Sequence, residues 1–196
     1  AYHRMVAWPT GEWGSVVNVG DDIKWRRDLK LERAWKDGNT GVPAVDAAMR
    51  QLIREGYIHN RGRMIVANYL VKNLRLDWRI GERHFARWLT DYDWGVNFMN
   101  WVGIAGILPT DQPLRTMNPY IQSKKTDPEL VYIRKYVPEL TPDIPDDVIH
   151  DQSRREDVKN LAGEIVYPAP VVDYDESRLE YRKWAKKDLV GYHPAK

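Results

Sequence analysis

Acidic, amide and aromatic side chains are crowded into the eleven residues from Asp91 to Trp101. The run holds two aspartates and two asparagines among four large rings: Asp91, Asp93, Asn97, Asn100, Tyr92, Trp94, Phe98 and Trp101. Buried carboxylates and amides are costly unless a partner satisfies them, so a plain hydrophobic core does not need this mixture. The run therefore predicts a pocket wall around a large, polar, aromatic cofactor.

The composition is that of a globular protein, with 196 residues, 43% hydrophobic and 30% charged. Such a length suits one domain over residues 1–196. The chain has no cysteine, which excludes disulfides, Cys-ligated metals and Cys nucleophiles, and we expect no metal. No apolar run is long enough for a membrane span, so we expect a soluble intracellular protein of the cytoplasm or nucleus.

Positive charge is unevenly distributed along the chain. Between Arg50 and Arg87 there are nine Lys or Arg residues against three acids, although the formal net charge of the whole chain is only +2. Such a stretch could face a polyanion such as nucleic acid. Solvated helix faces would leave the same pattern, so charge alone does not decide between the two.

Helical signals position the chemistry-bearing residues. Pro43 suits a first helical turn and Gly56 a helix end, with Val45, Ala48, Met49, Leu52 and Ile53 recurring at helical spacing between them. Asn60 is expected to cap a second helix, with an apolar stripe through Leu74 opposite Arg61, Asn68, Lys72 and Arg75. A third helix is expected to begin near Gly81. The pattern predicts an all-α fold.

The second half of the chain carries weaker signals. Four prolines between Leu108 and Pro128 predict mostly ordered loop, and a short helix follows through Val131, Ile133 and Tyr136. A further helix is expected from Ser153 to Leu161. The last helix is expected from Glu176 to Leu189, with Leu179 and Trp184 facing inward.

Several segments, in the same order, resemble the DNA photolyase/cryptochrome family over roughly residues 20–140. They are Trp35–Arg50, His59–Met64, Leu76–Glu82, Asp91–Trp101, Asn118–Gln122, Tyr132–Arg134 and Val137–Leu140. The resemblance is to the C-terminal helical FAD-binding domain of that family. It implies that the preceding α/β antenna domain and the first part of the FAD region are missing, as in an excised fragment. An antenna pigment is then expected only in a full-length parent.

The resemblance implies that FAD is the cofactor, held by Arg63, Asp91, Asp93, Asn97 and Asn60. Asn97 matches the residue facing flavin N5, and the amide there is the photolyase-like choice. Arg63 and Asp91 match a pair beside the ring system, where a fixed guanidinium would stabilise a reduced, anionic flavin. An ordinary surface ion pair is the plainer interpretation of these two residues.

The resemblance also assigns Trp101, Trp78 and Trp25 to an electron relay that runs from the flavin to the surface. Packing is the ordinary role of a tryptophan and remains the alternative for each. On the DNA side, Asn60 and Met64 match residues at the opening that receives a pyrimidine dimer, and Arg61, Arg115 and Lys125 match basic contacts at its rim.

Some positions depart from the family pattern. Gly103 stands where many family members carry a substrate-stacking aromatic residue, and Asn97-Phe98-Met99-Asn100-Trp101 is similar to the spacing in DASH cryptochromes. Asn60 replaces a second histidine after His59 that (6-4) photolyases use, and His59 could equally be a core residue.

The resemblance implies a deoxyribodipyrimidine photolyase-like carbon–carbon lyase. It would split cyclobutane pyrimidine dimers in DNA by electron transfer from excited reduced FAD. The alternative is a cryptochrome blue-light photoreceptor with the same flavin and relay but little repair. A flavin-free scaffold is a third possibility, which the set of Arg63, Asp91 and Asn97 does not favour.

Overall fold

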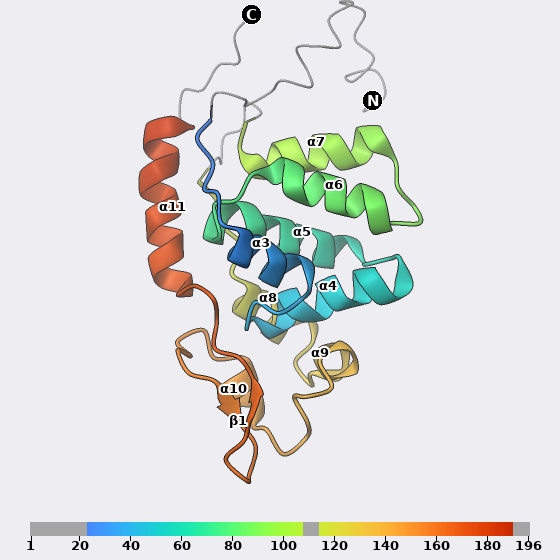
Figure 1. The fold of residues 1–196 in the computed structure, drawn as a ribbon, viewed down its shortest axis with the longest axis vertical. Helices are drawn as coiled ribbons and strands as arrows, with labels where there is room; N and C mark the ends of the chain where they lie inside the picture. The colour runs from blue at the N-terminus through green and yellow to red at the C-terminus, as the bar shows by residue number, and fades with distance from the viewer. Residues whose placement is uncertain (1–22, 108–113, 190–196) are drawn as a thin grey trace, which may run out of the picture.

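The computed structural model describes residues 23–107 and 114–189, and helices dominate them (Figure 1). This confirms the expected helical fold, with one short two-stranded sheet added. In chain order the described elements are α3 (Leu29–Lys36), α4 (Pro43–Glu55), α5 (Asn60–Asn68), the π-helix η1 (Tyr69–Asn73), α6 (Trp78–Trp88), α7 (Trp94–Ala105), α8 (Pro119–Thr126), α9 (Val131–Tyr136), α10 (Asp146–Ile149), β1 (Val158–Lys159), β2 (Ile165–Tyr167) and α11 (Tyr174–Asp188).

Figure 1 shows α4, α5, α6 and α7 stacked across the molecule, with α11 running along one edge and α9, α10 and the sheet at the lower end. In the main core, α4 packs against α5, α6 against α7, and α11 against η1. A second apolar cluster, which includes Leu130, Ile133 and Tyr167, packs at the lower end. None of the described helices is both long and apolar enough to cross a membrane.

Helix α4 forms as its punctuation predicts. Pro43 occupies the first turn, and Gly56 ends the helix in the left-handed region with φ 67°. Val45, Ala48, Met49 and Leu52 are fully buried. Ile53 was expected in the core and is 36% exposed, because the buried face of α4 does not extend to it.

The second predicted helix is divided in two. His59, not Asn60, is the N-cap of α5: its Nδ1 accepts a hydrogen bond from the Arg61 N–H at 3.2 Å. The helix then widens into η1 at Tyr69. A π-turn places an extra residue in the turn and rotates the following side chains. Asn68 and Lys72 were expected on the polar face, and both are buried instead.

Caps define the two helices nearest the Asp91–Trp101 run. Asp77 accepts the Arg79 N–H at 3.0 Å, so α6 begins at Trp78 rather than near Gly81. Asp93 accepts the Val96 N–H at 2.8 Å and caps the start of α7, and Gly106, with φ 75°, caps its end. Most of the run therefore lies on a helix whose first residue is Trp94.

The second half differs most from the expectation. Asn118 caps α8 inside the stretch expected to be mostly loop, of which 108–113 lie outside the described residues. The prediction of a helix from Ser153 to Leu161 is wrong. Its residues lead into an antiparallel hairpin whose turn is fixed by Asn160, with the Asn160 Oδ1 accepting the N–H groups of Ala162 and Glu164 at 3.0 and 2.9 Å.

The short helix through Val131, Ile133 and Tyr136 is confirmed as α9, with Ile133 and Tyr136 buried and Val131 exposed. Helix α11 begins two residues before the expected start. Its buried face is formed by Tyr174, Ser177, Tyr181 and Ala185. Trp184 packs partly against the core as expected, but Leu179 is 51% exposed because it lies away from this face.

Candidate functional site

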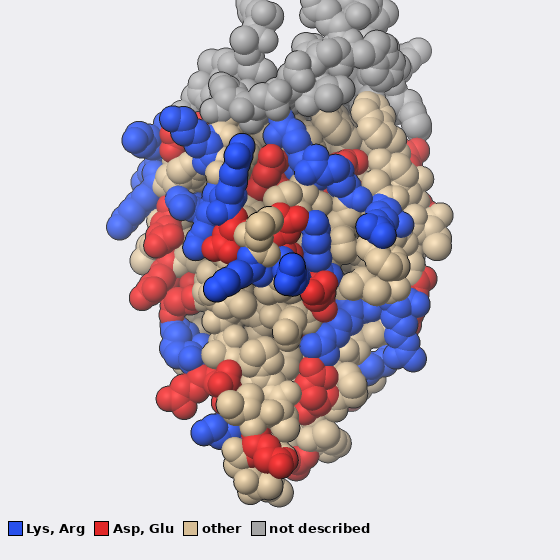
Figure 2. All heavy atoms as spheres, in the orientation of Figure 1, with Lys and Arg blue, Asp and Glu red and all other residues tan. Residues whose placement is uncertain are grey.

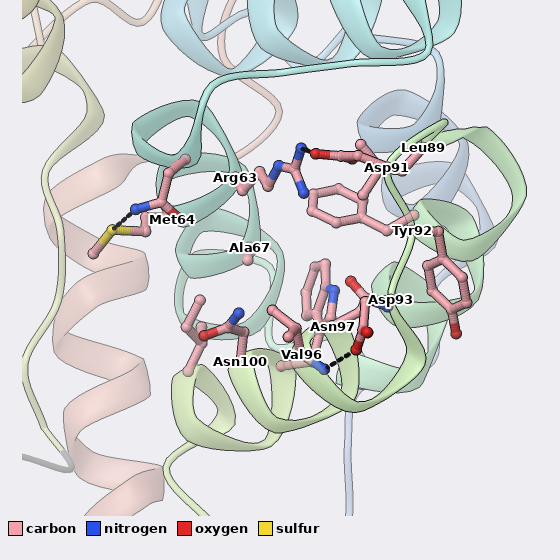
Figure 3. Close-up of a pocket in the computed structure, with 14 residues that line it drawn as sticks. Arg63, Met64, Ala67, Leu89, Asp91, Tyr92, Asp93, Val96, Asn97 and Asn100 are labelled. Atoms are coloured by element: carbon pink, nitrogen blue, oxygen red, sulfur yellow. Dashed lines mark hydrogen bonds and ion pairs between the residues drawn. The ribbon is translucent and has the colours of Figure 1, made fainter. Parts of the chain in front are cut away.

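A cavity of about 220 Å³ opens between α5, the segment after α6, and α7 (Figure 3). Figure 3 shows Arg63 and Asp91 on one side of it and Val96, Asn97 and Asn100 of α7 on the other. Seven of the residues predicted from the sequence line it: Asn60, Arg63, Met64, Asp91, Asp93, Asn97 and Trp101. The other lining residues are Ala67, Phe85, Leu89, Tyr92, Val96, Asn100 and Ile104.

Arg63 is fixed at three points. One guanidinium nitrogen donates to both carboxylate oxygens of Asp91 at 2.9 and 2.7 Å, and its Nε donates to the Ile58 carbonyl at 2.9 Å. The guanidinium also lies 5.5 Å from the centre of the Tyr57 ring. An ion pair with one side chain 49% exposed contributes little stability, so the main consequence of these contacts is a fixed positive group at the cavity edge.

Asn97 is oriented by α6. Its Nδ2 donates to the Glu82 side-chain oxygen at 3.1 Å and to the Glu82 carbonyl at 3.3 Å, and the Asn97 side chain is 8% exposed in all. The Tyr92 hydroxyl donates to the same Glu82 side-chain oxygen at 3.1 Å. Burial, followed by the nearby Glu82 charge, raises the pKa of Tyr92 to about 12. Because the Asn97 side-chain nitrogen already donates to Glu82, its carbonyl oxygen is the atom that can accept a hydrogen bond from a bound molecule.

Trp101 forms an inner wall of the cavity and lies flat against Gly81. A Cβ added at Gly81 would stand 2.1 Å from the Trp101 ring, so only glycine permits this approach. Trp78 lies on the same helix, one turn before Gly81, and packs edge-on against Phe98 at 5.4 Å between ring centres. Trp101 and Trp78 are each 2% exposed.

Trp25, the third predicted relay residue, lies before α3 and is only partly buried. Its ring centre is 5.2 Å from that of Trp184 on α11. The indole nitrogens of Trp25 and Trp78 are buried, and neither has a hydrogen-bond partner among the described residues.

The predicted rim residues lie outside the cavity. Arg61 lines a separate hollow with His59, while Arg115 and Lys125 are exposed on the segment before α8 and on α8 itself. At the cavity mouth the Asn60 amide lies 3.8 Å from the Met64 sulfur. His59 is exposed, so the core interpretation of this histidine is wrong.

Sequence reasoning missed Glu82 and Tyr92 as functional candidates. Glu82 follows Trp78 by four residues, and this spacing puts both on one side of a helix. That signal was present within the Leu76–Glu82 segment. The partner of Glu82, Asn97, lies on the next helix, and no spacing rule gives that contact.

Comparison with known proteins gives a consistent result. The family model for the FAD binding domain of DNA photolyase matches residues 1–187. The deoxyribodipyrimidine photo-lyase of Streptomyces griseus is 40% identical over 194 residues, which covers 93% of this chain and 42% of that protein. The chain thus spans about two fifths of the length of this relative.

Two solved structures share the fold. An archaeal photolyase from Sulfolobus tokodaii, which holds two FAD molecules, superposes with a TM-score of 0.78 at 37% identity, covering 90% of this chain and 40% of that one. A cryptochrome from Synechocystis gives a TM-score of 0.77 at 35% identity over 87% of this chain and 37% of its own. The chain belongs to the family of FAD-binding domains of DNA photolyases.

Proposed function

We propose that this chain is the flavin-binding part of a light-driven lyase that splits cyclobutane pyrimidine dimers in DNA. The observation that carries the proposal is the cavity. It is lined by the Arg63–Asp91 pair, the oriented Asn97 amide and the Trp101 ring. The photo-lyase names of the relatives support the same reaction.

The side chains around the cavity suit FAD. A planar aromatic guest finds apolar walls in Phe85, Leu89 and Trp101, and its polar edge finds Asp93, Asn97 and Arg63. Bound FAD would supply light absorption and one-electron chemistry, while the protein supplies position and electrostatics. Arg63 would hold negative charge near the ring system without swinging to solvent, because Asp91 and the Ile58 carbonyl fix it.

Asn97 would accept a hydrogen bond at its carbonyl oxygen from the N5 edge of the ring. Glu82 would act as a positioning residue, because it engages the Asn97 nitrogen and so determines which end of the amide faces the cavity. Asp93 lines the same cavity and caps α7. Its carboxylate would contact the pyrimidine end of the ring.

Trp101, Trp78 and Trp25 would recharge the cofactor. Trp101 would give up an electron to the light-excited cofactor, Trp78 would refill Trp101, and Trp25 would refill Trp78. The buried indole N–H groups of Trp78 and Trp25 have no acceptor among the described residues. An oxidised indole there would keep its proton, which favours onward transfer of the positive charge.

DNA with pyrimidine dimers would be the substrate partner. Asn60 and Met64 stand at the cavity mouth, and Arg61, Arg115 and Lys125 are exposed cations that could hold phosphates without reading sequence. Photolyases are a general example of enzymes that take their target out of the base stack, and a damaged pair costs less to unstack.

The test follows dimer loss under blue light in single- and double-stranded DNA, with FAD bound and reduced. Trp101→Phe should abolish steady photoreduction yet leave repair by chemically reduced protein within about twofold, because the relay recharges the cofactor and takes no part in dimer splitting. Trp88→Phe, at a partly buried indole of α6, is the matched control. Equal loss of both activities in Trp101→Phe would exclude the relay assignment.

A blue-light photoreceptor of cryptochrome type is the second candidate. Gly103 is exposed on α7, two residues after Trp101, where a repair enzyme of this family often carries a stacking ring. The Synechocystis cryptochrome also shares the fold. Absence of dimer loss with reduced FAD present would favour this candidate over repair.

A further inference from the structure

The outer end of the tryptophan series is a pair of indoles and not a single ring. Trp25 and Trp184 meet at 5.2 Å between ring centres and an interplanar angle of 53°. Trp184 in turn lies 5.9 Å from the buried ring of Tyr181 on the same helix. The pair joins the segment before α3 to α11, so positive charge that reaches Trp25 arrives at a surface shared by both.

A hollow of about 510 Å³ opens beside this pair, and we name it the exit hollow. Its lining residues comprise two tryptophans, four cations, one acid and one isoleucine: Ile23, Lys24, Trp25, Arg26, Arg75, Trp184, Lys187 and Asp188. Arg26 also meets Asp28 at 3.4 Å. Lys and Arg side chains gather on the upper half of the face in Figure 2, where Figure 1 places the end of α11 and the segment before α3.

Arg75 reaches this hollow from an unusual backbone conformation. Its φ is 55°, in the left-handed region that glycine adopts more readily than a residue with a side chain. The Arg75 carbonyl accepts the Arg26 N–H at 2.9 Å, and Arg26 forms a short parallel bridge with Leu76, so the backbone holds the two arginines near each other. The fold therefore holds an arginine beside the indole pair where glycine would be the easier choice.

Cations also predominate in a neighbouring hollow of about 1030 Å³. Arg26 and Lys24 line both hollows, and Arg27, Arg79 and Arg83 line the second, together with Asp28, Glu32 and Asp77. Asp77 lies 3.3 Å from Arg79. Cations outnumber acids in both hollows, and a concave surface with an excess of one sign of charge raises the local concentration of ions of the opposite sign.

We infer that the exit hollow receives a small anionic one-electron reductant. The inference rests on the tryptophan relay of the proposed function. The reductant loses one electron, the oxidised Trp25–Trp184 pair gains it and returns to its neutral state, and no bond forms or breaks. The spent reductant carries one negative charge fewer, so the hollow holds it less strongly and it leaves.

The cations also increase the driving force for this step. An oxidised indole is positive, and like charges nearby disfavour the charged form. Lys24, Arg26, Arg75 and Lys187 therefore make the oxidised pair a stronger oxidant while they attract the donor. The volume of the hollow lies within the range of small-molecule sites, which favours a small donor over an acidic electron-transfer protein.

The experiment uses three ferrocenes of different charge as reductants: ferrocenecarboxylate, hydroxymethylferrocene and (ferrocenylmethyl)trimethylammonium. Protein with FAD bound and oxidised is excited by a laser flash, and decay of the oxidised tryptophan is followed against reductant concentration. The carboxylate should react roughly tenfold faster than the trimethylammonium compound at low ionic strength. The difference should largely disappear at about 1 M salt, where screening is strong.

Lys24→Glu/Lys187→Glu reverses two exposed charges of the exit hollow and should abolish or invert the preference. Lys124→Glu/Lys159→Glu makes the same charge change at exposed positions that do not line the hollow, and it should retain the preference. Equal rates for all three ferrocenes, or equal effects of the two double variants, would overturn the inference. A faster reaction with an acidic reductant protein, without any charge preference among the ferrocenes, would also overturn it.

A dark measurement separates this inference from the relay itself. The ratio of iodide quenching to acrylamide quenching of tryptophan emission should be higher in the wild-type protein than in Lys24→Glu/Lys187→Glu. The reason is that the hollow concentrates anions beside Trp25 and Trp184. If no oxidised tryptophan forms after the flash, the relay fails and the inference fails with it. If it forms without charge preference, only the inference fails.

Discussion

At the scale of single residues, the decisive contact is that between Asn97 and Glu82. An asparagine can present either its oxygen or its nitrogen to a guest, and the two ends are opposite in hydrogen bonding. Glu82 accepts from the Asn97 nitrogen at 3.1 Å and from the Tyr92 hydroxyl at the same distance. One carboxylate thus orients the amide that faces the cavity.

Asn97→Asp should therefore destabilise the protein. The change replaces a donor with a carboxyl group near the Glu82 oxygen, so we expect a loss of about 2 kcal/mol near pH 8. In the variant, two carboxyl groups lie side by side, and their repulsion raises the pKa of one of them. A raised folded-state pKa gives stability that is lost as pH rises. The loss should be smaller near pH 5, as measured by urea unfolding.

Asn100→Asp is the matched control for this change. Asn100 lines the same cavity from the same helix but is exposed, so the substitution should alter stability by less than about 0.5 kcal/mol at either pH. An equal loss in both variants would show that the hydrogen bond between Asn97 and Glu82 is not the cause of the loss in Asn97→Asp.

His84 should make the protein sensitive to mild acid. Burial, followed by the nearby Lys36 and Arg87 charges, lowers the pKa of His84 to about 4, and its ring packs against Trp35 at 5.5 Å. The unfolded chain takes up this proton near pH 6.5 whereas the folded one does not, so stability falls as pH drops from about 6.5 towards 4.

His84→Phe should remove this dependence. Because the ring is partly exposed, we expect the wild-type protein to lose about 1 kcal/mol more than the variant between about pH 7 and pH 5. Phe85→Leu disturbs the same helix without removing a titrating group, and its effect should be equal at both pH values. Parallel curves for wild type and His84→Phe would contradict the assignment.

At the scale of elements, a buried carboxylate joins α4 to the hairpin. Asp46 is fully buried and accepts hydrogen bonds from the Thr40 N–H at 2.8 Å, the Thr40 hydroxyl at 2.6 Å, the Gly41 N–H at 3.0 Å and the Tyr167 hydroxyl. Arg154 adds contacts from its guanidinium to the Gly41 and Pro168 carbonyls. These bonds attach β2 and the residue after it to α4 and the loop between α3 and α4.

Asp46→Asn should cost about 3 kcal/mol, because it places an amide donor against groups that already donate. Burial raises the pKa of Asp46, with its hydrogen bonds acting in the opposite direction. A raised pKa gives stability that is complete below the unfolded-state value and is lost as pH rises. The gap between wild type and variant in denaturant unfolding should therefore narrow with increasing pH.

Tyr167→Phe is the control for the hairpin contact. It removes one donor and keeps the ring, so we expect a loss of about 1–2 kcal/mol. If Tyr167→Phe were as harmful as Asp46→Asn, the single bond from the Tyr167 hydroxyl, rather than the whole set of bonds to Asp46, would hold the hairpin.

At the scale of the whole molecule, the basic residues proposed to contact DNA and those of the exit hollow lie on different elements. Arg61 and Lys125 belong to α5 and α8, whereas the exit hollow is built from the segment before α3, Arg75 after η1, and α11. A uniform basic coating would bind any anion anywhere. Two sets at different places would allow one to hold DNA, as proposed, while the other admits the proposed reductant.

Arg61→Ala/Lys125→Ala should weaken binding of dimer-containing DNA and reduce the salt slope of log K by roughly two, with no change in ferrocene preference. Lys24→Glu/Lys187→Glu should leave DNA affinity and its salt slope unchanged and should abolish or invert the ferrocene preference. Filter binding across a salt series and flash kinetics on the same preparations measure both. Loss of DNA affinity in both pairs alike would mean that the protein has a single extended basic surface.

Local signals in the sequence predicted much of the helical core. Pro43, Gly56 and the apolar spacing between them define α4 because each acts through the backbone within a few residues. The failures lie where local rules stop. Lys72 is buried because η1 changes the turn, and the hairpin replaces a predicted helix because the Asn160 turn and the attachment of Tyr167 to Asp46 override weak helical spacing.

By itself, the sequence determined the set of chemical groups: the Asp91–Trp101 run, Arg63 and the aromatic residues that carry the family resemblance. Seven of the predicted site residues do line one cavity. Only the tertiary structure decided that Glu82 orients Asn97 and that Trp184 adjoins Trp25. Spacing patterns report which side of its own helix a residue occupies, whereas these contacts depend on how separate segments pack against one another.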